Sequence, residues 1–198
     1  MFLPALIAFG TRVVVGAQPR WIGCRPSDAL RIYYANHTSH FDTLALWSAL
    51  PAPLRRRTRP VAAKDYWGTG LRARLATDGF NALFIDRSGD KRDVDPLIPL
   101  YEALDRRESL IIFPEGTRRA QALPGPFKGG LFRLATRHPD AELVPVYLDN
   151  LYRSMPKGTY LPVPLSCSVR FGAPLERVAD EPKDVFLERA RDAIVRLA

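Results

Sequence analysis

The sequence has few of the residues from which metal sites and disulfide frameworks are built. It holds two cysteines, Cys24 and Cys167, and three histidines in 198 residues, which leaves little material for a disulfide framework or a zinc site. No run of about 18 uninterrupted apolar residues occurs, so no standard transmembrane helix is predicted. The Gly-x-Ser-x-Gly motif of serine hydrolases is also missing. These absences favour a metal-independent protein that is soluble or lies on a membrane surface.

Lysine is scarce, whereas arginine is abundant. Of the 29 basic residues 24 are arginine and five are lysine, and the formal net charge is +8. This excess suggests an anionic partner, which could be a nucleic acid, a membrane surface or a phosphorylated substrate. Arginine forms two-point contacts with phosphate oxygens, although a GC-rich genome would produce the same bias. The remaining composition is ordinary for a globular chain of this length, so one domain with a substantial core is predicted.

The first 20 residues form an apolar segment with two arginines, and they allow two interpretations. The segment lacks the basic start and the cleavage site of a signal peptide. We favour a helix in the membrane interface, with Arg12 and Arg20 at the lipid headgroups. Its inserted side chains would be Phe2, Leu3, Leu6, Ile7, Phe9 and Val13. The alternative is a first helix that packs on the protein's own core.

A second basic segment, Arg55-Arg56-Arg57 with Arg59, follows prolines that are expected to end a helix at Leu50. Such clusters are usually solvated loops, and contact with anionic lipid is the functional alternative.

The segment Asn36 to Asp42, N-H-T-S-H-F-D, directly follows a predicted strand from Arg31 to Ala35. A neutral imidazole can take a proton from an alcohol, and a carboxylate beside it fixes the tautomer and stabilises the imidazolium. The five-residue spacing of His37 and Asp42 does not suit one helical face, so His37 is expected in a loop and Asp42 in the first turn of a helix. The alternative is that these polar residues only cap that helix.

Further apolar strands are predicted at 81–87, 109–113, 142–148 and 166–171, with a short one at 60–63. Helices are predicted at 64–76, 94–106, 127–137 and 183–197. This alternation predicts a single α/β domain with a mostly parallel central sheet and helices on both faces. The strand ends carry polar pairs, Asp86 with Arg87 and Glu115 with Arg118. In a parallel sheet these ends share one edge with His37, where the arginines could hold a phosphate.

Four blocks in this order resemble the glycerolipid acyltransferase family, which contains the 1-acylglycerol-3-phosphate acyltransferases. They are N-H-x-S-H-x-D at 36–42, F-I-D-R at 84–87, F-P-E-G-T-R at 113–118 and V-P-V at 144–146. A glycine-containing element, Phe127 to Gly130, also stands where members of the family carry one. The resemblance covers residues 30 to 172. It implies the fold of the glycerol-phosphate acyltransferases.

The resemblance also implies a mechanism. His37 would be the general base and Asp42 its orienting partner, and the alkoxide formed would attack the thioester of an acyl-CoA or of an acyl carrier protein. No cofactor is implied. The residues that would bind the glycerol phosphate are Arg87, Glu115, Gly116, Thr117 and Arg118, with Asn36, Ser39, Lys128 and Pro145 in secondary roles.

Several of these residues have a structural alternative. His40 could be a structural or supporting residue, Glu115 could orient Arg118, and Lys128 could be a solvated residue. Val144 to Val146 would shape either the acyl pocket or the core.

The expected reaction is acylation of lysophosphatidate to phosphatidate on the cytoplasmic face of a membrane rich in anionic lipid, in a bacterial cell. Another lysophospholipid or an ornithine-type lipid could replace this acceptor, because the transfer step is the same. A non-catalytic module that binds anionic lipid is the alternative from another class, and a nucleic-acid partner is not expected.

Overall fold

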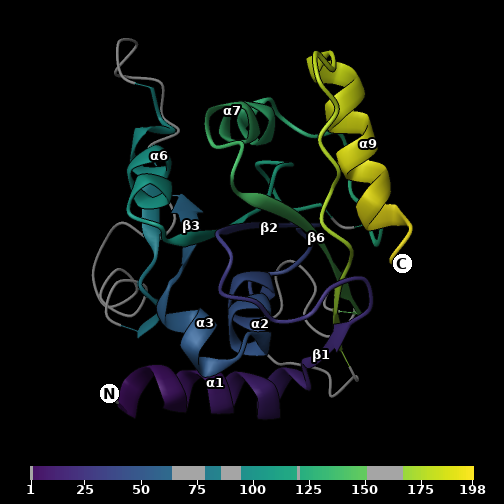
Figure 1. Cartoon of the computed structure of the whole chain (residues 1–198). Coiled ribbons are helices and arrows are strands. Elements are labelled where there is room, and N and C mark those ends of the chain that lie inside the picture. Colours follow the sequence, from purple (N-terminus) through teal and green to yellow (C-terminus); the bar gives the residue numbers. More distant parts are fainter. Residues whose placement is uncertain (1, 64–78, 86–94, 120, 151–166) are drawn as a thin grey trace.

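The computed structural model describes residues 2–63, 79–85, 95–119, 121–150 and 167–198, and strands alternate with helices along most of them (Figure 1). The strands are β1 (Gln18–Trp21), β2 (Arg31–Ala35), β3 (Thr58–Ala63), β4 (Leu83–Ile85), β5 (Ser109–Ile112), β6 (Glu142–Asp149) and β7 (Ser168–Phe171). The helices are α1 (Phe2–Val15), α2 (Asp42–Ala49), α3 (Ala52–Arg56), α6 (Ile98–Asp105), α7 (Gly130–Arg137) and α9 (Lys183–Val195).

The described strands form one sheet in the order β1-β7-β6-β2-β5-β3-β4. Neighbouring strands are parallel except β6 and β7, which run antiparallel. Parallel neighbours need crossover connections, and these carry helices onto the faces of the sheet. The predicted fold class, a single α/β domain with a mostly parallel sheet, is confirmed.

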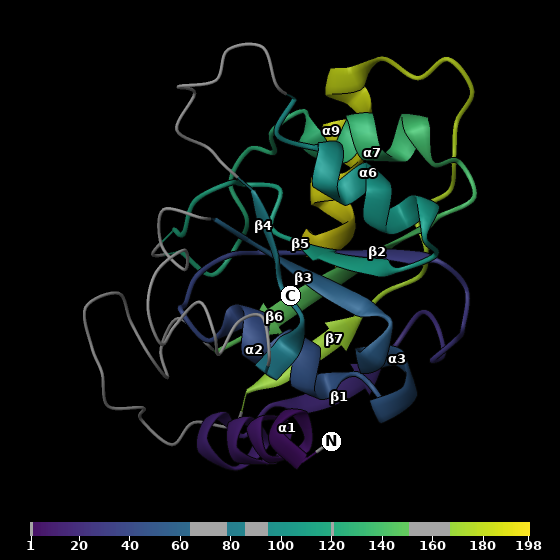
Figure 2. The same cartoon turned by 90° about the vertical axis from the view of Figure 1, so that its left-hand side faces the viewer.

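Helices cover both faces of the sheet. Figures 1 and 2 show α1, α2 and α3 on one side and α6, α7 and α9 on the other. Successive side chains of a strand point to opposite faces, and in β2 every residue is buried. Tyr33 and Ala35 belong to the apolar cluster on the α1–α2 side, whereas Ile32 and Tyr34 belong to the cluster on the α6–α7–α9 side. Strand β2 is therefore central, and the segment after it is anchored from both layers.

Two elements escaped prediction from the sequence. Strand β1 is an edge strand that pairs with β7, and its first three residues are exposed, so it lacks the apolar run of a buried strand. Helix α3 places part of the arginine cluster in a short helix instead of a loop. It contains Pro53, which a helix tolerates in its first turn because the N–H missing from proline would have no intrahelical partner there.

The predicted strands and helices lie close to their observed positions, with small shifts at the ends. The helix expected from 127 begins at Gly130, and the helix expected at 94–106 is α6. The helix expected at 64–76 lies outside the described residues.

The first helix packs on the protein and also presents an apolar face to the outside. Ala8 and Thr11 of α1 are buried, and Ile7 packs against the core beside α2. The guanidinium of Arg12, which was expected at the lipid headgroups, donates to the Ser48 carbonyl at the end of α2 (2.9 and 2.5 Å), and its place at a membrane stays a prediction. Exposed apolar side chains of α1 are Leu3, Leu6, Phe9 and Val13. None of the described helices is long and apolar enough to cross a membrane.

Candidate active site

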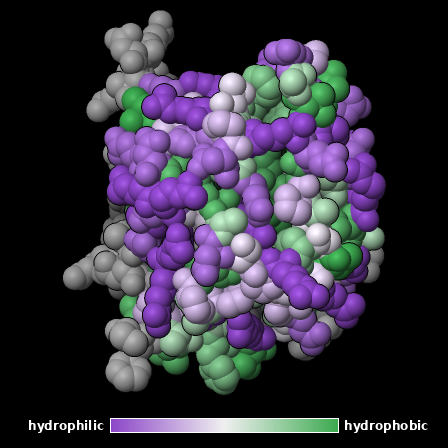
Figure 3. Space-filling view, in the orientation of Figure 1, coloured by the Kyte–Doolittle hydropathy of each residue, from purple (hydrophilic) through white to green (hydrophobic). Residues whose placement is uncertain are grey.

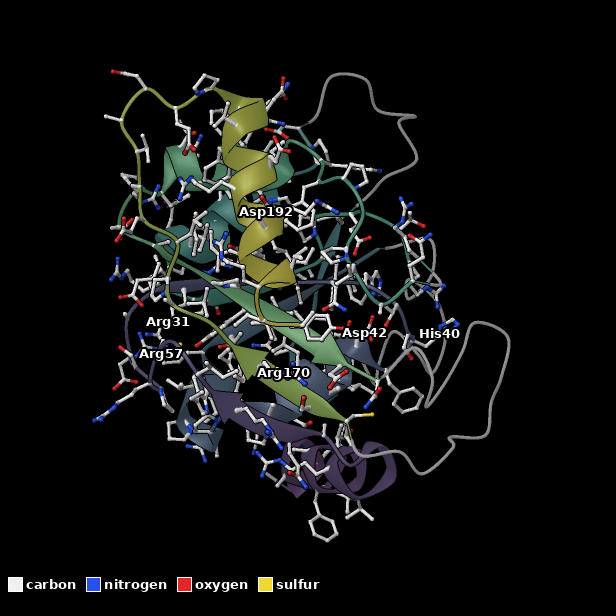
Figure 4. The ribbon with its side chains drawn as sticks, turned by 90° about the vertical axis from the view of Figure 1, so that its right-hand side faces the viewer. Arg31, His40, Asp42, Arg57, Arg170 and Asp192 are labelled. Atoms are coloured by element: carbon white, nitrogen blue, oxygen red, sulfur yellow. The ribbon has the colours of Figure 1, made fainter. Side chains whose placement is uncertain are left out.

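The predicted catalytic segment lies at the carboxyl edge of the sheet. Strands β2 and β5 are parallel neighbours with Tyr34 opposite Ile112, so the segments that follow them leave the sheet at the same edge. The His37 ring stacks on Phe113 at 4.2 Å between ring centres. In Figure 4 the labelled Asp42 and His40 lie on one side of the molecule, while Arg31, the first residue of β2, lies on the other. Chemistry-bearing side chains from two motifs therefore meet at one place.

His37 and Asp42 form a direct pair. The His37 Nδ1 lies 2.8 Å from Oδ2 of Asp42, whose side chain is fully buried. The same oxygen accepts the backbone N–H groups of Thr38 (2.5 Å) and Ser39 (2.8 Å). Two backbone donors hold this carboxylate oxygen, so Nδ1 carries the proton that faces it and Nε2 is the nitrogen able to take a proton. As predicted, His37 lies in a loop and Asp42 begins α2.

Glu115 is turned inward. It is 5% exposed, and its Oε1 accepts the backbone N–H of His37 at 2.8 Å while its Oε2 accepts that of Gly125 at 2.9 Å. It is not among the residues that line the neighbouring cavity. In this arrangement Glu115 holds two loops in place through their backbones. The role expected for it as a direct ligand of glycerol phosphate is not supported by this orientation.

Asn36 joins the ends of β2 and β6. Its side-chain oxygen accepts the Leu148 N–H (2.8 Å), and its amide nitrogen donates to the Leu148 carbonyl (3.2 Å). Ser39 is buried, and its hydroxyl accepts the N–H of Phe41 (3.3 Å). Neither side chain lines the cavity. Through these hydrogen bonds, Asn36 and Ser39 hold in place the backbone segment that carries His37 and Asp42.

A cavity of about 570 Å³ opens beside His37 and has two chemically different ends. Its polar end carries His37, His40, Gly116, Thr117, Arg118 and Lys128. Its apolar end lies between the sheet and helices α6 and α7. The apolar lining includes Val61, Ala62, Ile85, Leu97, Leu100, Ile112, Leu131 and Leu134. Such a shape suits a molecule with a charged head and a hydrocarbon chain.

Gly116 and Lys128 are in close contact at the polar end. Gly116 has φ +72°, a left-handed conformation that glycine adopts without strain. A Cβ at this position would also lie 2.9 Å from the Lys128 Nζ and 2.8 Å from its Cε. A glycine here therefore lets the ammonium group lie against the turn that carries Thr117 and Arg118. Arg118 itself donates to His40, and the two side chains line the cavity together.

Comparison with known proteins supplies the family. A family model described as "Acyltransferase" matches residues 25–149, which is more than half of the chain. The chain belongs to this acyltransferase family. It is 30% identical to a 1-acyl-sn-glycerol-3-phosphate acyltransferase of Limnanthes alba over 146 residues, 73% of this chain and 50% of that protein. It is 28% identical to the alpha form of the human enzyme over 201 residues, 98% of this chain and 66% of that protein.

A solved structure has the same fold. The crystal structure of the 1-acyl-sn-glycerophosphate acyltransferase from Thermotoga maritima matches with a TM-score of 0.76 at 21% identity, covering 98% of this chain and 78% of that one. The chain spans about half to two thirds of the length of the curated relatives named above.

Of the four blocks, N-H-x-S-H-x-D and F-P-E-G-T-R line the cavity together. Among the described residues, the F-I-D-R block contributes only Ile85 to the lining, and the V-P-V block contributes none. Arg87 and Asp86 lie outside the described residues. Val144 and Val146 are fully buried in the core on the α1–α2 side, and Pro145 is buried beside them. Of the two interpretations, the burial of these residues supports the core, and none of the three lines the cavity.

The sequence analysis missed the apolar wall of the cavity. Leu100 of α6 and Leu134 of α7 have the same sequence spacing as leucines that only fill a core. No local signal in the sequence therefore distinguishes leucines that line a cavity from leucines that are packed in the core. It also missed Arg133, which lines the cavity and pairs with Asp95. Within the described ranges no group of three or more His, Cys, Asp and Glu side chains is placed to hold a metal ion.

Proposed function

We propose that this member of the acyltransferase family moves a fatty acyl group from a thioester donor, acyl-CoA or acyl carrier protein, to the free hydroxyl of 1-acylglycerol-3-phosphate. One observation carries the proposal. The His37–Asp42 pair stands on a cavity that has cationic side chains at one end and a hydrocarbon lining at the other. The acceptor has a phosphate, a hydroxyl and an acyl chain, and this cavity offers a matching group for each.

The reaction follows from the pair. Nε2 of His37 takes the proton of the acceptor hydroxyl, and Asp42 stabilises the imidazolium that forms. The alkoxide oxygen attacks the thioester carbonyl, the carbon–sulfur bond breaks, and an ester bond forms. The proton held on His37 then passes to the leaving sulfur. The buried carboxylate keeps the ring in one tautomer throughout, so the base needs no rearrangement between turnovers.

The phosphate of the acceptor lies, in this proposal, against Arg118 and Lys128, with Gly116 and Thr117 forming the turn beside it. Charge-assisted hydrogen bonds to phosphate oxygens are among the stronger polar contacts in proteins. The resemblance assigns Arg87 to the same phosphate. Other lysophospholipids or an ornithine-type lipid would use the same transfer step, and the two cations favour the acceptor with a terminal phosphate over them.

The chain is proposed to act on a membrane surface rich in anionic lipid, on the cytoplasmic face. The exposed apolar side of α1 forms part of the lower edge of the molecule in Figure 3. Arg12 of α1 and Arg55 of α3 both donate to the Ser48 carbonyl, so two guanidinium groups lie close to this helix. Apolar side chains beside excess positive charge are what an amphipathic interfacial helix requires.

The decisive experiment is acyl transfer from radiolabelled acyl-CoA to lysophosphatidate, with lysophosphatidylcholine, an ornithine-type lysolipid and no acceptor in parallel. Each acceptor is also tested with a radiolabelled acyl group carried on an acyl carrier protein as the donor. Labelled phosphatidate from the wild type, and its loss in His37→Ala, would support the proposal. A wild type that acylates none of these acceptors with either donor would overturn it. Lipid binding that persists unchanged in His37→Ala, without product, would favour a non-catalytic binding module.

A further inference from the structure

Two adjacent glycines stand at the start of α7, and they face different neighbours. Gly129 is the residue before the helix, and Gly130 is its first residue. Gly130 lines the cavity, whereas Gly129 is not among the lining residues. A Cβ on Gly129 would lie 3.8 Å from Cδ of Lys183 in α9. A Cβ on Gly130 would lie 3.7 Å from Cδ2 of Leu97, at the start of α6, so Gly130 is the glycine that faces the substrate.

The backbone of Gly130 does not require a glycine. Its conformation is that of an α-helix, which alanine adopts more readily than glycine does. Gly116 is the opposite case, because its φ of +72° favours glycine whatever the space around it. A separation of 3.7 Å from Leu97 is ordinary van der Waals contact, so one methyl group would fit at Gly130. The space that a larger side chain would take up there belongs to the cavity.

Gly130 lies where the polar end of the cavity passes into the apolar end. Lys128, two residues before it, lines the polar end. Leu131 and Leu134, which follow it along α7, line the apolar end, and both are buried. On this wall the change from a charged to a hydrocarbon lining therefore falls at Gly130. A substrate with its phosphate at Lys128 and its chain among the leucines has to lie across the Gly130 backbone.

Leu97 is tied to α7 beside Gly130. The Asp95 carboxylate accepts the Leu97 N–H through Oδ1 (3.0 Å), and its Oδ2 accepts a hydrogen bond from Arg133. Arg133 stands three residues after Gly130, so Asp95 joins the start of α6 to the first turn of α7. Leu97 is also buried in the apolar cluster of that face. A branched side chain at Gly130 would therefore extend into the cavity, because Leu97 has little freedom to move aside.

We infer that Gly130 is a specificity-determining residue: it keeps open the junction between the two ends of the cavity, where the hydrocarbon chain of the substrate leaves the phosphate site. This inference rests on the proposed function, which supplies a substrate with both groups. Gly130 takes no part in proton transfer or in holding the phosphate. Its effect is confined to chains long enough to pass it, so chain length is the variable that reveals it.

Three variants grade the width of the junction, and a fourth is the matched control. Gly130→Ala adds one methyl group that fits against Leu97, whereas Gly130→Val adds a branched side chain that also extends into the cavity. Leu97→Ala in the Gly130→Val background gives the new side chain room to turn away from the cavity. The control is Gly129→Val, which adds the same side chain one residue earlier, outside the cavity lining.

Alkyl phosphates carry a phosphate and a hydrocarbon chain, and their binding tests the junction without catalysis. In calorimetric titrations the wild type should gain up to about fourfold in affinity per methylene between butyl and dodecyl phosphate, as expected for burial of CH₂ groups. Gly130→Val should bind butyl phosphate within about twofold of the wild type and dodecyl phosphate at least about tenfold more weakly. Gly130→Ala should stay within about threefold for both ligands, and Leu97→Ala should restore most of the loss in the Gly130→Val background.

The pattern across the two ligands decides the inference. Equal losses for butyl and dodecyl phosphate in Gly130→Val, or no loss for either, would overturn it. A matching loss for dodecyl phosphate in Gly129→Val would overturn it as well, because that side chain lies outside the cavity lining. Wild-type binding of both ligands by Gly129→Val is the expected result.

Acyl transfer separates this inference from the proposed function. With acyl donors and lysophosphatidates each varied in chain length, Gly130→Val should lower kcat/KM for the longest chains of at least one series by about tenfold more than for the shortest. If transfer proceeds and Gly130→Val affects all chain lengths alike, the inference fails while the proposed function stands. If no acyl group is transferred but Gly130→Val selectively weakens dodecyl phosphate, the proposed function fails while the role of Gly130 in admitting a hydrocarbon chain stands.

Discussion

Glu115 holds the backbone of His37. One carboxylate oxygen accepts the His37 N–H at 2.8 Å, and the other accepts the N–H of Gly125 at 2.9 Å, three residues before Lys128. One buried side chain therefore sets both the loop of the proposed general base and the loop of Lys128, the proposed phosphate-binding cation. A residue within the F-P-E-G-T-R block can thus matter for catalysis without touching the substrate.

Glu115→Gln tests this relationship. The glutamine oxygen can accept from one of the two N–H groups, but its amide nitrogen would face the other donor and leave it unsatisfied. We expect kcat to fall more than about tenfold and the free energy of unfolding to fall by about 1–3 kcal/mol, the usual cost of an unsatisfied buried group. Acyl transfer and urea unfolding measure the two effects. Glu142→Gln, which breaks a pair at the start of β6, is the control and should leave kcat unchanged.

Asp42→Asn is expected to remove most of the activity while preserving the size of the side chain. The oxygen that accepts from His37, Thr38 and Ser39 would be replaced in part by a donor, and the ring would lose its fixed tautomer. Because general-base catalysis typically contributes about 10²–10⁴-fold, we expect kcat to fall within that range with little change in the Michaelis constant of the acceptor. A loss seen only in the Michaelis constant would assign Asp42 to substrate binding instead.

Local patterns predicted much of this fold because they depend on neighbours in the chain. The run from Arg31 to Ala35 is buried on both faces and read as a strand, and the five-residue spacing placed His37 in a loop. Strand β1 was missed because its exposed residues at a sheet edge carry no such pattern. The contact of Arg12 with the Ser48 carbonyl was not predicted, because that partner comes from another helix.

The shape of the site could not be predicted for the same reason. The inward turn of Glu115 depends on Gly125, and the contact of Arg118 depends on His40, 78 positions earlier. The cavity is lined by residues of α6 and α7 together with residues of β3, β4 and β5, which are far apart in the sequence. A sequence motif shows which side chains are present. Which of these side chains face the cavity depends on packing between segments that are distant in the sequence.

Chain-length preference should depend on the apolar end of the cavity. Leu134→Ala enlarges it and should shift the preference toward longer acyl chains, while Val61→Phe fills it and should favour shorter ones. Series of acyl donors and of lysophosphatidates, each varied in length, would measure the shift. A shift in the donor series alone would place the acyl chain of the donor in the cavity. A shift in the lysophosphatidate series alone would place the acyl chain of the acceptor there.

Leu46→Ala is the matched control for this experiment. Leu46 is fully buried in the core on the opposite face of the sheet and does not line the cavity. Truncation of a buried leucine costs about 2–5 kcal/mol of stability, so this variant should lose stability without a change in chain-length preference. An equal change of preference in Leu46→Ala would show that the effect reflects general loosening of the fold.

Glu181 should stabilise the N-terminal part of α9 in a pH-dependent way. Its carboxylate accepts two hydrogen bonds from Arg189 (2.8 and 2.6 Å), and these lower the pKa of Glu181. A lowered folded-state pKa gives stability that is present above the unfolded-state pKa and is lost as the pH falls through the folded-state pKa. Glu181→Gln should therefore be less stable than the wild type at pH 7, by at most about 1 kcal/mol, and the difference should shrink below about pH 4. Urea unfolding at both pH values tests this, with the exposed Glu102→Gln as control.

The outward face of α1 gives the sharpest test of membrane binding. Leu6 and Phe9 are 66% and 68% exposed, and burial of such a side chain in hydrocarbon is worth about 1.5–3 kcal/mol. Glutamate preserves the helix, so the double substitution Leu6→Glu/Phe9→Glu should lower affinity for phosphatidylglycerol vesicles by more than about tenfold. Val185→Glu, an exposed apolar residue of α9 in the opposite layer, should leave vesicle binding unchanged.

The same variants separate binding from chemistry. The double variant should keep wild-type kcat on a short-chain lysophosphatidate that is soluble in water, because no residue of α1 lines the cavity. It should lose rate only on acceptors presented in vesicles. Wild-type affinity for vesicles in the double variant would assign the exposed face of α1 to something other than lipid. Reduced kcat on the soluble acceptor would mean that α1 supports the site through α2, to which the Arg12–Ser48 contact ties it.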